Sequence, residues 1–171
     1  MENALIPLLV IGTIASIWDL RTGRIPNALT FGAALVAIVV RLVVGGPAAA
    51  GWAMVGWAVG CALFMPVYLL GGMGAGDVKL LAAIGAWVGP MAALKVAFFS
   101  TLAGGVLAIV VALARGYLRQ ALSNVWLLLC HWRVMGLKPL DEVSLQAASG
   151  SPRLAYGLAI TAGSMAWLWM K

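Results

Sequence analysis

The chain has 171 residues, of which 64% are hydrophobic and only 9% are charged, and its mean hydropathy is +1.05. A soluble domain carries about 25% charged residues, because its surface faces water. The polar side chains of this chain are too few to cover a globule in water. The composition therefore excludes an ordinary soluble domain and predicts an integral membrane protein.

The net charge of +6 does not indicate a nucleic-acid-binding protein. The basic residues are scattered singly between apolar runs, and aromatic residues do not interleave with them as a single-strand binding surface requires. The two cysteines, Cys61 and Cys130, lie far apart and form no CxxC pair. We therefore expect no zinc site, no disulfide framework and no cofactor.

The apolar runs predict an all-α membrane helix bundle that forms a single domain over residues 1–171. Six candidate transmembrane helices lie at residues 4–18, 28–44, 51–70, 80–94, 96–114 and 154–170. Several are shorter than the ~20 residues that cross a hydrocarbon core of ~30 Å. No positively charged segment precedes the first run, so we expect it to be retained as a membrane helix rather than cleaved as a signal peptide.

The one long connection in this scheme covers residues 115–153. Within it, residues 122–132 mix aliphatic residues and tryptophans with polar residues, which predicts a helix lying in the membrane interface. Residues 138–152 are polar and rich in turn-forming residues, so we expect them to be mobile.

The distribution of lysine and arginine predicts the orientation. With the N-terminus outside, the cytoplasmic segments hold eight basic residues, Arg21, Arg24, Lys79, Arg115, Arg119, Arg133, Lys138 and Arg153, and the other side holds three, Arg41, Lys95 and Lys171. This arrangement follows the positive-inside rule. It also places Asp19 and Asp77 on the cytoplasmic side.

Asp19 and Asp77 stand out among the five acidic residues because each adjoins a long apolar run. An ionisable group at membrane depth costs a few kcal/mol, which makes it a candidate functional residue. Simpler explanations exist for both: Asp19 pairs with Arg21 or Arg24 at the headgroups, and Asp77 caps the fourth helix after a glycine-rich loop.

Two carboxylates held close together share a proton, because both do not ionise easily. The ionised member then takes a proton from water while the protonated member polarises a peptide carbonyl, which is general acid–base hydrolysis. No serine–histidine–acid set competes, since His131 is the only histidine and lies in the predicted interfacial helix. The pair predicts an aspartyl protease.

Two segments, residues 19–27 (DLRTGRIPN) and residues 73–80 (MGAGDVKL), together resemble the type IV prepilin peptidase family. The resemblance implies a GxGD-type membrane aspartyl protease that removes the short basic leader of prepilins at the cytoplasmic face of the bacterial inner membrane. It implies that Asp19 and Asp77 are catalytic and that Gly74 and Gly76 shape the active-site loop. Lys79 belongs to the motif without an assigned role.

The chain departs from the longer members of that family, which carry paired cysteines in an N-terminal cytoplasmic domain and also methylate the new N-terminus. It resembles the short, peptidase-only members that serve tight-adherence (Flp-type) pili, so we expect no methyltransferase activity. Near the C-terminus, residues 153–159 resemble a family block that usually has prolines where this chain has Ala155 and Leu158.

The sequence thus predicts a prepilin peptidase whose partners are a single-span prepilin and the lipid bilayer, with no metal or cofactor. Two alternatives remain: a small proton- or cation-coupled transporter that uses Asp19 and Asp77 as ion sites, and a non-catalytic subunit of pilus assembly. The sequence names neither the prepilin, nor the residues that bind its leader, nor the oligomeric state.

Overall fold

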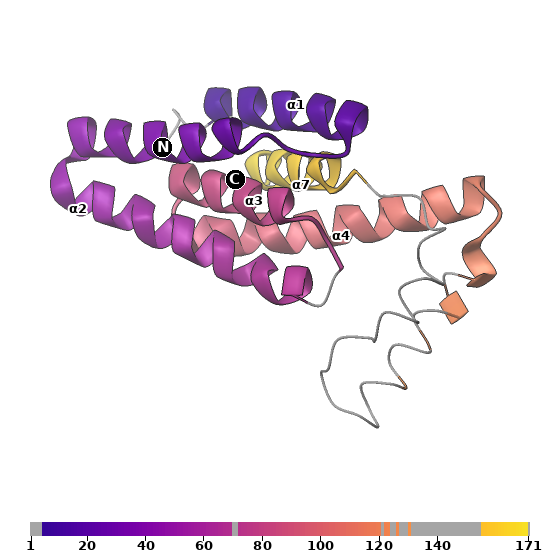
Figure 1. The fold of residues 1–171 in the computed structure, drawn as a ribbon. Coiled ribbons are helices and arrows are strands. Elements are labelled where there is room, and N and C mark those ends of the chain that lie inside the picture. Colours follow the sequence, from indigo (N-terminus) through magenta and orange to yellow (C-terminus); the bar gives the residue numbers. More distant parts are fainter. Residues whose placement is uncertain are drawn as a thin grey trace.

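A computed structural model describes residues 5–69, 72–120, 122–123, 126, 130 and 155–170 of the chain. Within these residues the chain is helical and contains no strand (Figure 1). The helices are α1 (Leu5–Thr22), α2 (Asn27–Leu69), α3 (Ala75–Val88), α4 (Pro90–Ala114) and α7 (Tyr156–Trp169). The prediction of an all-α fold is confirmed.

Helix α2 consists of two arms that meet at Gly46, where the backbone leaves the helical conformation with φ 74° and ψ −173°. The positive φ favours glycine, and Pro47 begins the second arm, where its missing N–H costs no hydrogen bond. Figure 1 shows the chain turning back on itself at this point. The two arms correspond to the second and third predicted membrane helices.

The boundary between the fourth and fifth predicted helices is wrong by several residues. We expected the break near Lys95, whereas α3 ends at Val88 and α4 begins at Pro90. Gly89 between them has φ 86°, a conformation that glycine adopts without strain. Lys95 lies inside α4 instead, because a long lysine side chain can extend out of an apolar helix toward water.

Helix α3 lies at the centre of the bundle. Its residues from Leu80 to Ala86 are all buried, and α2 is its main neighbour. The close approach depends on glycine: a Cβ at Gly56 would overlap the carbonyl of Gly85, and one at Gly60 would lie 2.6 Å from the carbonyl oxygen of Leu81. Small residues spaced four apart are the usual device for close helix packing in lipid.

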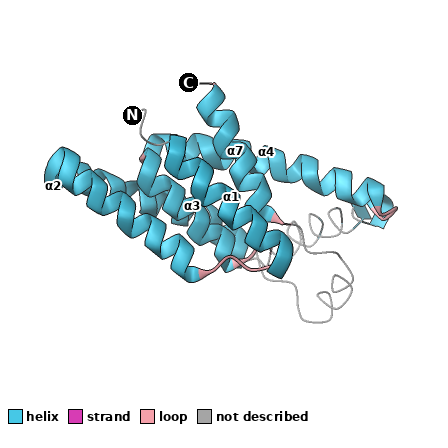
Figure 2. Cartoon of the chain, turned by 90° about the horizontal axis from the view of Figure 1, so that it is seen from above, coloured by secondary structure: helices cyan, strands magenta, loops and turns pink. Residues whose placement is uncertain are grey.

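The outward faces of α1, α2 and α4 carry large apolar side chains, as lipid contact requires. These three helices are long and apolar enough to cross a membrane. Helices α3 and α7 have 14 residues each, so the described residues do not confirm six transmembrane helices. Seen from above, the helices lie alongside one another (Figure 2).

Most of the predicted interfacial helix at 122–132, and the polar segment at 138–152, lie outside the described residues.

Candidate active site

Asp77 lies in the first turn of α3 and is held by its own helix. Its carboxylate Oδ2 accepts a hydrogen bond of 3.1 Å from the N–H of Gly74, the residue that caps the helix. In return the N–H of Asp77 donates to the carbonyl of Gly74 at 3.1 Å. Such reciprocal bonds satisfy N–H groups that have no partner inside a helix, so the sequence around Asp77 fixes its position locally.

The glycines before Asp77 let this turn approach the segment between α1 and α2. A Cβ at Gly76 would lie 3.1 Å from the Cβ of Ile25, which is itself buried. A Cβ at Gly74 would lie 3.3 Å from the carboxylate of Asp77. Both glycines therefore border the site, and the packing leaves little room for a larger residue at either position.

Asp19 lies in the last turn of α1, which ends at Thr22. The chain then turns at Gly23, whose φ is 63° and whose N–H donates to the carbonyl of Asp19 at 2.8 Å. The carboxylate Oδ2 of Asp19 accepts a hydrogen bond of 2.9 Å from the N–H of Gly157, in the first turn of α7. The negative C-terminal end of α1 disfavours a carboxylate, whereas the positive N-terminal end of α7 favours one.

The two aspartates interact electrostatically in the folded protein. Asp77 is 8% exposed, and Asp19 is partly buried. Burial, together with the negative charge of Asp19, raises the pKa of Asp77 from its ordinary 3.8 to about 6, against the opposing effect of the Gly74 N–H. A raised pKa in one member is the behaviour expected of two carboxylates that share a proton.

The carboxylates of both aspartates are held by backbone N–H groups. In the part of the chain that the structure describes, no lysine or arginine forms an ion pair with Asp19 or Asp77, whose carboxylates bond to backbone N–H groups instead. The simpler explanation of Asp19 as a headgroup partner of Arg21 or Arg24 is therefore wrong. The explanation of Asp77 as the N-cap residue is also wrong, because Gly74 is the N-cap and Asp77 is the third residue of the helix, from which its carboxylate bonds back to Gly74. This bond is compatible with a chemical role.

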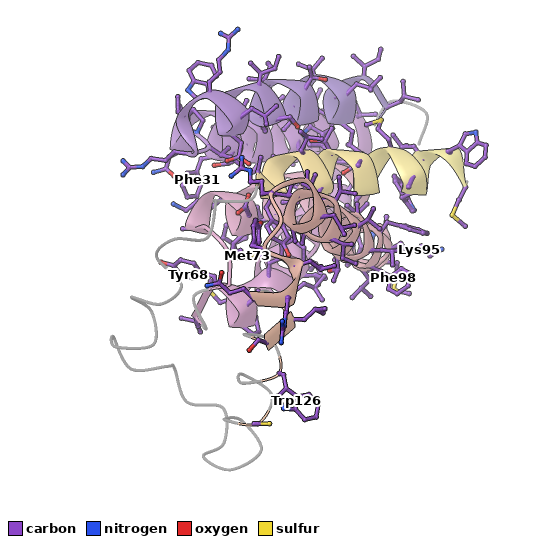
Figure 3. The ribbon with its side chains drawn as sticks, turned by 90° about the vertical axis from the view of Figure 1, so that its right-hand side faces the viewer. Phe31, Tyr68, Met73, Lys95, Phe98 and Trp126 are labelled. Carbon is purple, nitrogen blue, oxygen red and sulfur yellow. The ribbon has the colours of Figure 1, made fainter. Side chains whose placement is uncertain are left out.

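Lys79 ties α3 to the start of α2. Its Nζ donates to Oδ1 of Asn27 at 2.9 Å and lies 5.3 Å from the centre of the Phe31 ring, within the range of a cation–π contact. Figure 3 shows Phe31 on the side of the bundle opposite Lys95 and Phe98. The geometry thus gives Lys79 a contact between two helices and no bond to either carboxylate.

Two residues of α7 border the site, and the sequence did not identify them as site residues. Gly157 bonds to Asp19 as described, and burial together with the negative charge of Asp77 raises the pKa of Tyr156. The only sequence signal was that both residues lie in the block at 153–159, for which the resemblance gave no role. Ala155, one of the two positions without the usual proline, directly precedes α7, and the helix forms nonetheless.

The described residues contain no group of three or more histidine, cysteine or acidic side chains placed to hold a metal ion. The junction of α1, α3 and α7 holds two carboxylates, and the pKa of one of them, Asp77, is about 6. A pair of this kind can exchange protons with water and with a peptide bond.

No curated protein and no solved structure matches the chain. The sequence profile of the type IV leader peptidase family matches residues 6–109, which include α1, α2, α3 and both aspartates. This match and the three helices able to cross a membrane identify a membrane-bound peptidase. The match covers more than half of the chain, and the chain therefore belongs to the type IV leader peptidase family.

Proposed function

We propose that this protein is an aspartyl endopeptidase of the bacterial inner membrane that removes the short basic leader from Flp-type prepilins at the cytoplasmic face. One observation carries the proposal: burial and, to a smaller extent, the negative charge of Asp19 on a different helix raise the pKa of Asp77 to about 6. Membership of a leader peptidase family supplies the class of reaction.

The raised pKa assigns a role to each carboxylate. Asp77 carries the shared proton and donates it to the oxygen of the scissile peptide carbonyl, while ionised Asp19 takes a proton from the attacking water. The water oxygen bonds to the carbonyl carbon and forms a tetrahedral intermediate. When the C–N bond breaks, the proton on Asp19 passes to the departing nitrogen, and the proton on the former carbonyl oxygen returns to Asp77. No covalent bond to the enzyme forms at any stage.

The length of α3 is consistent with a site that water can enter. A helix of 14 residues is about 21 Å long, which is shorter than a hydrocarbon core of ~30 Å. With its C-terminal part buried in the bundle, the N-terminal turn that carries Asp77 ends inside the membrane margin. A prepilin segment that unwinds there presents an extended peptide bond to the pair while its basic leader stays in the cytoplasm.

Membership of a peptidase family favours this function over the transporter alternative. The remaining alternative is a subunit that has kept the fold and lost catalysis. A carboxylate with a raised pKa favours an active enzyme, since a scaffold gains nothing from burying one.

The test is leader removal in reconstituted vesicles, with a candidate Flp-type prepilin as substrate and a gel shift as the measurement. Asp19→Asn and Asp77→Asn are each expected to lower the rate by about a hundredfold to ten-thousandfold, the usual contribution of a general acid or base. Thr101→Val is the matched control, because the Thr101 hydroxyl bonds only to the carbonyl of Ala97 in its own helix, at 2.9 Å.

Cleavage by the wild type and by Thr101→Val, and by neither asparagine variant, supports the proposal. Wild-type rates in both asparagine variants would exclude the carboxylate pair. If the wild type leaves every prepilin tested intact while the protein is folded and inserted, the non-catalytic subunit becomes the better interpretation.

A further inference from the structure

The carboxylate of Asp19 is held by a helix outside the segment that matches the family. The N–H of Gly157 donates to Oδ2 of Asp19 across a distance of 2.9 Å. Gly157 is the second residue of α7, so its N–H has no acceptor within its own helix and is free to bind a carboxylate. The family match ends at residue 109 and assigns nothing to α7.

The absence of a side chain at Gly157 is part of this contact. A Cβ there would lie 3.0 Å from Oδ2 and 3.3 Å from Cβ of Asp19, which is closer than ordinary van der Waals contact. Gly157 is not among the glycines with positive φ, so alanine can adopt its backbone conformation. A larger residue at this position therefore requires the Asp19 side chain to shift.

A row of polar contacts fixes the register of α7 against α1 next to this hydrogen bond. The hydroxyls of Ser16 and Thr161 lie 2.9 Å apart, and Thr161 also donates to the carbonyl of Gly12 at 3.0 Å. Ser16, Gly12 and Asp19 lie on one face of α1 because they are three and four positions apart. The same face therefore sets both the position of α7 and the position of the carboxylate.

We propose that Gly157 is a positioning residue of the catalytic pair: its N–H and its lack of a side chain hold the Asp19 carboxylate at the distance from Asp77 that catalysis needs. The inference rests on the proposed peptidase function and extends it to α7. Gly157 acts through Asp19 and donates no proton to the substrate.

The kinetic test compares three glycine-to-alanine variants. Gly157→Ala is expected to lower kcat by about tenfold with KM for the prepilin unchanged, because a misplaced catalytic group slows chemistry without weakening binding. Gly105→Ala, where no atom lies within 4 Å of the added Cβ, is expected to behave like the wild type. Gly163→Ala places its Cβ against Ser100 of α4, so it disturbs the packing of α7 without touching Asp19.

A second measurement does not depend on the choice of substrate. The chain has three aspartates, Asp19, Asp77 and Asp141, so protein labelled with ¹³C only at the aspartate side-chain carboxyl gives three carboxyl signals in micelles, which single asparagine variants assign. Gly157→Ala is expected to shift the Asp19 signal, whereas Gly105→Ala leaves it in place.

Each outcome decides between the two proposals. A low kcat in Gly157→Ala but not in Gly105→Ala, together with a displaced Asp19 signal, supports the positioning role. Equal kcat in Gly157→Ala and Gly105→Ala overturns it and leaves the peptidase function intact, because the wild type still cleaves. If the wild type does not cleave, the peptidase proposal fails, and an unmoved Asp19 signal then overturns the contact itself.

Discussion

Asp77 is held by the first turn of its own helix, whereas Asp19 is held by a helix that begins more than a hundred residues later in the chain. The hydrogen bond to Asp77 comes from Gly74, three positions away, and the hydrogen bond to Asp19 comes from Gly157, 138 positions away. Asp77 is buried, and Asp19 is only partly so.

The two carboxylates are therefore positioned in different ways, one by local contacts and the other by tertiary contacts. A local cap places Asp77 as soon as α3 forms, and the burial that follows raises its pKa. Asp19 depends on the packing of α7 against α1, which forms only when the whole bundle is assembled. The two residues therefore respond differently to substitution, and the predictions below test that contrast.

The largest expected effect concerns the stability cost of burying Asp77. Its pKa rises from 3.8 to about 6 on folding, a change worth about 3 kcal/mol at ~1.4 kcal/mol per unit. Because folding raises the pKa of Asp77, the protonated carboxyl makes its full contribution to the free energy of unfolding below pH 3.8. This contribution is lost as the pH rises through about 6. Asp77→Asn is therefore expected to be more stable than the wild type at pH 7.5 and equally stable near pH 4.

Thermal unfolding in micelles at the two pH values measures this difference. A stability gain that is the same at both values would show that the effect does not come from ionisation of Asp77.

The next effect concerns the pH dependence of cleavage. If Asp77 supplies the proton, the rate is expected to fall above about pH 6, by about tenfold for each further pH unit. Cleavage of a reconstituted prepilin between pH 5 and pH 8 gives the profile. A rate that rises through pH 6 would reverse the roles assigned to the two aspartates.

A smaller effect is expected where α7 meets α1. Thr161→Val removes hydroxyl bonds to Ser16 and to the carbonyl of Gly12, and it should lower the free energy of unfolding by about 0.5–1 kcal/mol, as such bonds do in membrane bundles. Thr101→Val is the control, since both threonines bond to a carbonyl four positions earlier and only Thr161 also contacts α1. Equal stability losses in the two variants would indicate that the contact with α1 contributes nothing.

The smallest effect is expected at Lys79. Lys79→Met removes the bond to Asn27 and the contact with Phe31, and it should cost less than about 1 kcal/mol of stability. The pH profile of cleavage should stay in place, because Lys79 is not among the causes that shift the pKa of Asp77. Lys95→Met, on the opposite side of the bundle (Figure 3), serves as the control; a moved profile in Lys79→Met alone would assign Lys79 to the electrostatics of the pair.

Local features of the fold were predictable because each depends on neighbouring residues. The shortage of charged residues predicted a helical membrane protein, and the apolar runs left a gap between two of its helices at residues 45–50, where the structure has a break at Gly46. The predicted break between the fourth and fifth helices lay at Lys95, whereas α3 and α4 separate at Gly89 and Pro90. A glycine followed by a proline interrupts a helix through backbone geometry, whereas a lysine can remain inside one.

By itself the sequence determined the class of protein, the approximate position of its apolar helices and the two carboxylates able to do chemistry, because composition and the cost of charge in lipid act residue by residue. Only the tertiary structure decided that Asp77 is buried beside Asp19, that no basic residue of the described segments pairs with either carboxylate, and that Gly157 holds Asp19. These features depend on how α1, α3 and α7 pack together. That packing depends on contacts between residues far apart in the chain, such as those between Gly12 and Thr161.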